Sequence, residues 1–151
     1  MIRQYQEWLD FEKNITERLD ALEKVFSGEL SFLVTPSTAT HKITDLNGAT
    51  PPTDTVTIKL VDDEGNVYTK YNGPIKLAIA DTSTNGTAAI TPSSTTPNMT
   101  NGVYTVTVSY TKASTGWTNA ETATLTVSDP DTDGIAGWSV ASATFTMTAE
   151  T

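Results

Sequence analysis

The chain contains no cysteine and only one histidine among its 151 residues. The absence of cysteine excludes a disulfide framework, a thiolate nucleophile and a zinc–thiolate site. Basic residues are also scarce, with 9 Lys and Arg against 18 Asp and Glu, so the formal net charge is −9. Because such a surface repels phosphate backbones and anionic lipids, we expect neither nucleic acid nor a membrane as a partner.

Long apolar runs are missing as well. No run approaches the roughly 20 residues of a membrane-spanning helix, and the first residues lack the apolar stretch of a secretory signal, so we expect the chain to stay in the cytoplasm after synthesis. About one residue in five is threonine, which is typical of half-exposed strands in extracellular modules. A virion protein, made in the cytoplasm and later exposed outside it, would reconcile the two observations.

Residues 1–29 differ from the rest because they contain no proline and their apolar residues recur at three- and four-residue steps, once Glu12 is allowed to occupy one core position. This spacing predicts one amphipathic helix at about 2–27, followed by Gly28 as its C-cap. We expect the helix to form a coiled coil, with a trimer favoured, or to anchor in a major capsid or other virion protein. The alternative is a helix that packs on its own domain. The expected contact residues are Trp8, Phe11, Ile15, Leu19, Leu22 and Phe26.

Residues 30–151 alternate between apolar and polar side chains, with turn residues between the alternating segments. Such a pattern predicts a second unit that is mostly β, a β-sandwich of Greek-key type, which the resemblance described below implies to be immunoglobulin-like. The predicted strands are 31–36, 55–62, 67–71, 74–80, 87–91, 102–110, 120–128 and 140–149.

The run from Val56 to Ile79, the pair Asn101-Gly102 and the segment Ala123 to Val127 resemble bacterial immunoglobulin-like domains of the invasin and intimin type. The resemblance covers about half the chain and implies the fold, since such modules serve as spacers, stalks and displayed knobs. The layout of one helix before one sandwich also resembles phage head-decoration proteins and head fibres. That likeness implies a non-enzymatic virion subunit that displays the sandwich on a capsid.

A candidate metal site lies in the loop before the last predicted strand, at Asp129, Asp131 and Asp133. Alternating carboxylates followed by Gly134 match the first half of a calcium loop. The second half does not match, because Val140 stands where such a loop needs a glutamate. The other interpretation is a solvated acidic turn, and we expect no other cofactor.

Two aromatic residues, Trp117 and Tyr110, suggest an alternative function, an adhesive or carbohydrate-binding module of a phage tail or bacterial surface. Their ring faces could stack on a sugar of the host surface. The other interpretation places these rings in the core.

Catalytic motifs are lacking: the sequence has no nucleophile elbow, no phosphate-binding glycine loop and no paired histidines. His41 stands in a threonine-rich stretch with Asp45 four residues away, and we expect it to be a surface histidine. We therefore assign no catalytic residue and expect that the protein is not an enzyme.

Overall fold

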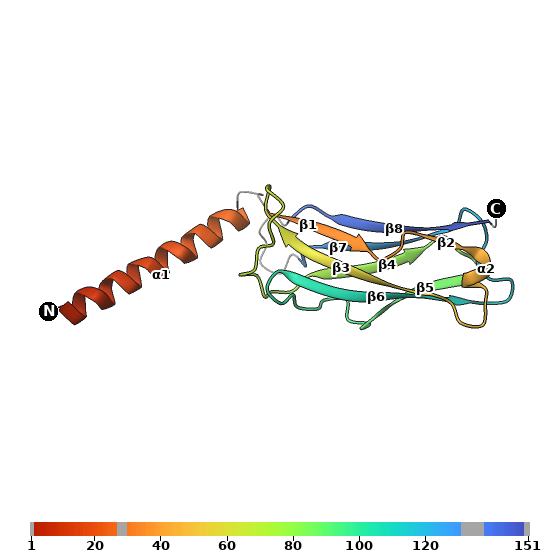
Figure 1. Ribbon diagram of the computed structural model, residues 1–151, viewed down its shortest axis with the longest axis horizontal. Helices are drawn as coiled ribbons and strands as arrows, with labels where there is room; N and C mark the ends of the chain where they lie inside the picture. The colour runs from red at the N-terminus through yellow and green to blue at the C-terminus, as the bar shows by residue number, and fades with distance from the viewer. Residues whose placement is uncertain (1, 27–29, 131–137, 150–151) are drawn as a thin grey trace.

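The computed structural model describes residues 2–26, 30–130 and 138–149, with backbone alone for 20–26. The protein is mostly β, with one long N-terminal helix and two four-stranded sheets. Helix α1 spans Ile2–Phe26 and extends away from one end of the sandwich (Figure 1). The helix predicted at 2–27 is thereby confirmed over 2–26, whereas residue 27 and the predicted C-cap Gly28 lie outside the described residues.

Sheet A has the order β1-β3-β6-β5, and all its neighbours are antiparallel. Sheet B has the order β2-β8-β7-β4, in which β2 runs parallel to β8. The strands are β1 (Ser31–Pro36), β2 (Thr40–Lys42), β3 (Thr53–Val61), β4 (Lys76–Asp81), β5 (Gly86–Thr91), β6 (Val103–Lys112), β7 (Thr122–Ser128) and β8 (Ala141–Thr148).

This topology is that of an immunoglobulin sandwich. The order of sheet A corresponds to the ABED sheet, and β8-β7-β4 corresponds to the GFC sheet. The short β2 adds a parallel strand at the edge of the second sheet. The predicted fold class is therefore confirmed.

Alternation along the strands builds the core between the two sheets. In β3 the side chains of Val56, Ile58 and Leu60 are fully buried, and Leu125 and Phe145 face them from sheet B. The core cluster draws all its members from Leu30 onward, and none comes from the described part of α1. The sandwich therefore closes its core without α1.

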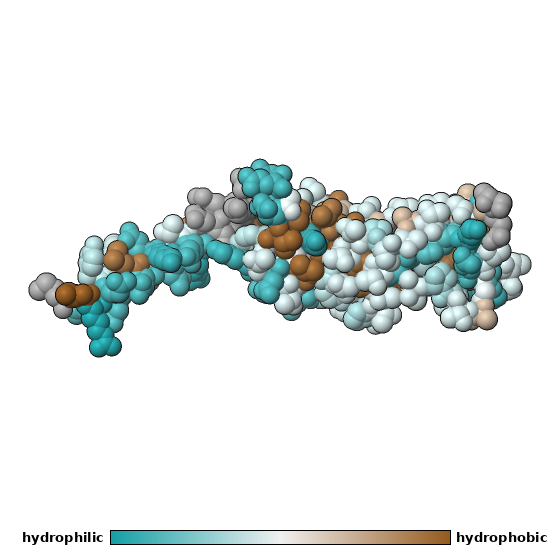
Figure 2. All heavy atoms as spheres, viewed as in Figure 1, coloured by the Kyte–Doolittle hydropathy of each residue, from teal (hydrophilic) through white to brown (hydrophobic). Residues whose placement is uncertain are grey.

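Threonine occupies many of the outward positions that alternate with this core. Thr105 in β6 and Thr144 in β8 are exposed, and the Oγ1 atoms of Thr124 and Thr144 approach to 3.5 Å across neighbouring strands. Figure 2 accordingly shows a sandwich surface of mostly intermediate hydropathy. β-Branched side chains suit these positions because they fit a pleated, half-exposed surface.

Two parts of the strand prediction are wrong. Residues 67–71 form no strand, because a single bridge at Val67 gives way to a turn closed by the Tyr71 N–H and the Tyr68 carbonyl. Their alternating pattern arises because Tyr68 and Tyr71 pack on the core from a loop. The sequence interpretation also missed β2 and the short helix α2 (Ile43–Leu46), which are too brief to show a period.

Candidate functional site

Four large residues lie on one face of α1, and we term them the apolar stripe: Trp8, Phe11, Ile15 and Leu19. At about 100° of rotation per residue, the stripe occupies an arc of about 80°. The side chains of Trp8 and Phe11 are 59% and 63% exposed, and those of Ile15 and Leu19 are 40% and 54% exposed. The structure thus leaves the stripe uncovered by the chain's own sandwich.

Outside the apolar stripe, the surface of α1 is mostly polar. Arg3 pairs with Glu7 at 3.8 Å and Lys13 pairs with Glu17 at 4.0 Å, both at helical spacing. Exposed pairs of this kind stabilise a helix by only about 0.3–0.5 kcal/mol each. This polar surface therefore suits water, and the apolar stripe contributes nothing to stability unless a partner covers it.

The sequence also placed Leu22 and Phe26 in this contact. The backbone of α1 continues through both residues, but their side chains lie outside the described part of the chain. Their place in the stripe remains a prediction from their spacing.

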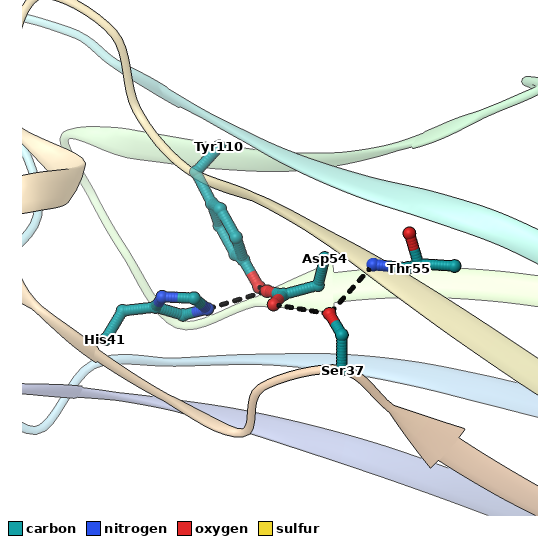
Figure 3. Close-up of polar contacts among 5 residues, drawn as sticks. All are labelled: Ser37, His41, Asp54, Thr55 and Tyr110. Atoms are coloured by element: carbon teal, nitrogen blue, oxygen red, sulfur yellow. Dashed lines mark hydrogen bonds and ion pairs between the residues drawn. The ribbon is translucent and has the colours of Figure 1, made fainter.

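A buried polar network joins the two sheets (Figure 3). His41 lies on β2 of sheet B, whereas Asp54 and Tyr110 lie on β3 and β6 of sheet A. The Asp54 Oδ2 atom is 2.6 Å from the His41 Nε2 atom and accepts the Tyr110 hydroxyl at 2.7 Å. The other oxygen, Oδ1, accepts the Ser37 hydroxyl at 3.3 Å. One carboxylate thus holds three donors from three separate segments.

The network corrects the prediction that His41 is a surface residue. His41 is 8% exposed and Asp54 is 1% exposed. A charge of this kind is buried only where hydrogen bonds and an opposite charge compensate it. The partner lies 13 residues away in the sequence, so local composition around the histidine gave no sign of it. The missed signal was Asp54 itself, an acid in register with the inward positions of β3.

The same geometry does not support nucleophilic catalysis by Ser37. Its hydroxyl donates to Asp54 and accepts the Thr55 N–H at 3.0 Å, whereas a serine nucleophile must donate to the histidine. The arrangement is a cross-link between sheets. Burial raises the pKa of the Tyr110 hydroxyl well above its usual range, and the hydrogen bond and the charge of Asp54 raise it further.

The predicted glycan contact at Trp117 and Tyr110 is wrong, because these side chains are 1% and 3% exposed. Their rings meet edge to face with centroids 5.8 Å apart. The Trp117 indole N–H donates to the Thr111 carbonyl at 3.0 Å, and the Asn47 side chain binds both the N–H and the carbonyl of Trp117 at 2.8 Å. Neither ring presents a face to a sugar.

Of the predicted calcium ligands, Asp129 is partly buried, and Asp131 and Asp133 lie outside the described residues. Within residues 2–26, 30–130 and 138–149, no three His, Asp or Glu side chains gather as a metal site would require. The calcium loop stays a prediction. Across the same residues, no helix is both long and apolar enough to cross a membrane.

No protein-family model matches the chain, and no curated protein matches it in sequence. Among solved structures, the chain is similar to part of a β-glucuronidase from Parabacteroides merdae, with a TM-score of 0.47 and 14% identity. The alignment covers 78% of this chain and 12% of that enzyme, so the chain spans only a small part of the enzyme's length. A likeness of this size carries no argument about activity. The chain is thus described by its fold, an immunoglobulin-like sandwich preceded by one helix.

Proposed function

We propose that this chain is a non-enzymatic structural protein that assembles through α1 and displays its sandwich on a larger particle. The particle is a virion, and the chain serves there as a capsid-decoration or head-fibre subunit. The observation that carries the proposal is the exposed apolar stripe on α1, which packs against no other described part of the chain.

The physical argument starts from helix stability. A helix gains most of its stability from packing one apolar face, and α1 has no such packing over residues 2–19. Trp8 and Phe11 leave more than half of their surfaces in water, which is unfavourable by about 25 cal/mol for each Å² of apolar area. A partner that covers the stripe removes this cost.

The partner that best fits the spacing is another copy of α1. Three- and four-residue steps across the apolar positions make a seam that identical helices can share as a coiled coil. Aromatic residues at the seam need more room than a two-stranded interface gives, which favours three strands. A groove on a capsid protein is the other partner that the stripe would fit.

The arrangement of the chain supports display. Helix α1 leaves one end of the sandwich, and β8 runs toward the opposite end (Figure 1). A bundle of α1 helices would therefore carry the sandwiches outward from an attachment point. The buried Asp54 carboxylate has three internal hydrogen-bond partners, which suits a structural role.

The virion assignment is supported by the layout, which resembles head-decoration proteins and head fibres. The adhesive alternative was suggested by Trp117 and Tyr110, and these residues no longer support it because both are core residues. Binding to a host glycan would need other residues.

Light scattering on the full chain and two variants tests the proposal. Leu19→Asp places a charge in the stripe, and Asn14→Asp adds the same charge outside it. We expect a trimer for the wild type and Asn14→Asp, and a monomer for Leu19→Asp. Equal masses for the two variants would contradict assembly through the stripe, and a wild-type monomer that binds capsids would identify α1 as an anchor.

A further inference from the structure

A cavity of about 630 Å³, widely open to solvent, lies beside the buried network, between β2, α2 and the segment that leads into β3. This volume lies in the range of about 300–1,000 Å³ that small-molecule sites occupy. Its lining comprises five threonines together with Lys42, Asp45, Gly48, Ala49, Pro52, His41 and Asp54. No part of the proposed function uses this cavity.

His41 gives the cavity a directed polar group. Its Nε2 atom binds Asp54, whereas its Nδ1 atom has no hydrogen-bond partner among the described residues. Figure 3 shows this second ring nitrogen outside the network of hydrogen bonds. Every fully buried side-chain polar atom in the described part of the chain has a partner, so the free Nδ1 atom must have access to solvent, and the cavity is the opening that His41 lines.

The hydrogen bonds of Asp54 determine what Nδ1 can do. Because this carboxylate accepts from Ser37 and Tyr110 as well, the His41 Nε2 atom serves as a donor and carries the proton. A neutral imidazole protonated at Nε2 has a bare lone pair on Nδ1. In its neutral form, the His41 ring therefore offers the cavity a fixed hydrogen-bond acceptor at Nδ1, held in place by the buried Asp54 carboxylate.

The lining selects a class of ligand. The lining carries two acids, Asp45 and Asp54, against one base, Lys42, which disfavours an anion, and the net charge of −9 disfavours it further. A metal ion would need a cluster of ligands that the described residues do not form. The hydroxyls of Thr38, Thr44 and Thr50 disfavour a purely apolar ligand. The class of ligand that remains is a neutral, hydroxyl-rich molecule.

We infer that the cavity beside His41 binds a neutral sugar residue. One sugar hydroxyl donates to the His41 Nδ1 atom, and others bond to the threonine hydroxyls on the rim. The inference does not rest on the proposed function, because it involves no residue of α1. It also differs from stacking on Trp117 and Tyr110, since it needs no aromatic face.

The single histidine makes the test direct, because its ring nitrogens give unique signals in a long-range ¹H–¹⁵N correlation spectrum. The full chain is titrated separately with glucose, galactose and N-acetylglucosamine. We expect the Nε2-protonated tautomer, and a saturable shift of the Nδ1 signal with at least one sugar, with a dissociation constant on the order of 1 mM. Amide signals of residues 38–54 should move with it.

Two exposed threonines supply a variant and its control. Thr50→Val removes one rim hydroxyl and should weaken binding about fivefold, the equivalent of one hydrogen bond. Thr105→Val makes the same change on the outer face of β6 and should leave binding unchanged. The inference is overturned if no sugar moves the His41 signals, if the proton resides on Nδ1, or if both variants bind as the wild type does.

Discussion

The His41 Nε2 and Asp54 Oδ2 atoms lie 2.6 Å apart and join opposite sheets of the sandwich, from the edge strand β2 to β3. The antibody fold joins its sheets by a disulfide between two other strands, B and F. This chain has no cysteine. A charge-assisted hydrogen bond thus ties the edge strand β2 to β3 and, through Tyr110, to β6. These hydrogen bonds fix the position of β2 relative to β3 and β6, because each donor reaches its acceptor in only one alignment of the strands.

Asp54→Ala should destabilise the sandwich strongly. The substitution leaves the buried His41 and Tyr110 side chains without their shared acceptor, and it also removes the acceptor of the exposed Ser37 hydroxyl. Breaking a buried pair in this way costs about 3–5 kcal/mol. Urea unfolding measures the loss, and Asp63→Ala, at an exposed acid, should change stability by less than about 0.5 kcal/mol. Equal urea midpoints for the two variants would show that the buried network contributes nothing to the free energy of unfolding.

Alkaline pH should also destabilise the fold through Tyr110. Burial raises the pKa of its hydroxyl in the folded state, whereas an unfolded tyrosine ionises near pH 10. Its contribution is therefore fully present below about pH 10 and is lost as the pH rises further. The free energy of unfolding should fall by up to about 1.4 kcal/mol per pH unit from this group.

Tyr110→Phe removes the titrating group and serves as the comparison. Urea unfolding at a series of pH values above 9 should give a shallower decline for this variant than for the wild type. Parallel declines would mean that Tyr110 does not govern alkaline stability.

Much of the sandwich could be predicted from alternation alone. The segments that became β3, β6 and β7 alternate cleanly because one face of each is buried. The segment at 67–71 shows where alternation fails as a predictor of strands. Its apolar and polar residues alternate as in a strand, but Tyr68 and Tyr71 cover the core from a loop. Periodicity reports which side chains are buried and does not report which backbone atoms pair.

The buried network could not be predicted in the same way. Its members come from sequence positions 37, 41, 54 and 110, and only the sheet topology brings them together. Threonine-rich surroundings made His41 resemble a surface residue. Asp54 was the usable signal, because an acid at an inward position of a strand requires a partner.

Trp117→Ala should distinguish a core residue from a contact residue. The indole is 1% exposed and packs against Tyr110, so its removal should lower the free energy of unfolding by about 3–5 kcal/mol. Thermal unfolding followed by circular dichroism measures the change. A variant as stable as the wild type would indicate that Trp117 is not a core residue, and the prediction that it contacts a glycan would stand again.

Sedimentation equilibrium on the full chain and on a chain that begins at Leu30 tests assembly through α1 most directly. The shorter chain retains every member of the core cluster and should fold. We expect a trimer for the full chain and a folded monomer for the shorter one, because only the full chain carries the apolar stripe. A full chain that stays monomeric at every concentration, or a shorter chain that still forms trimers, would contradict the account.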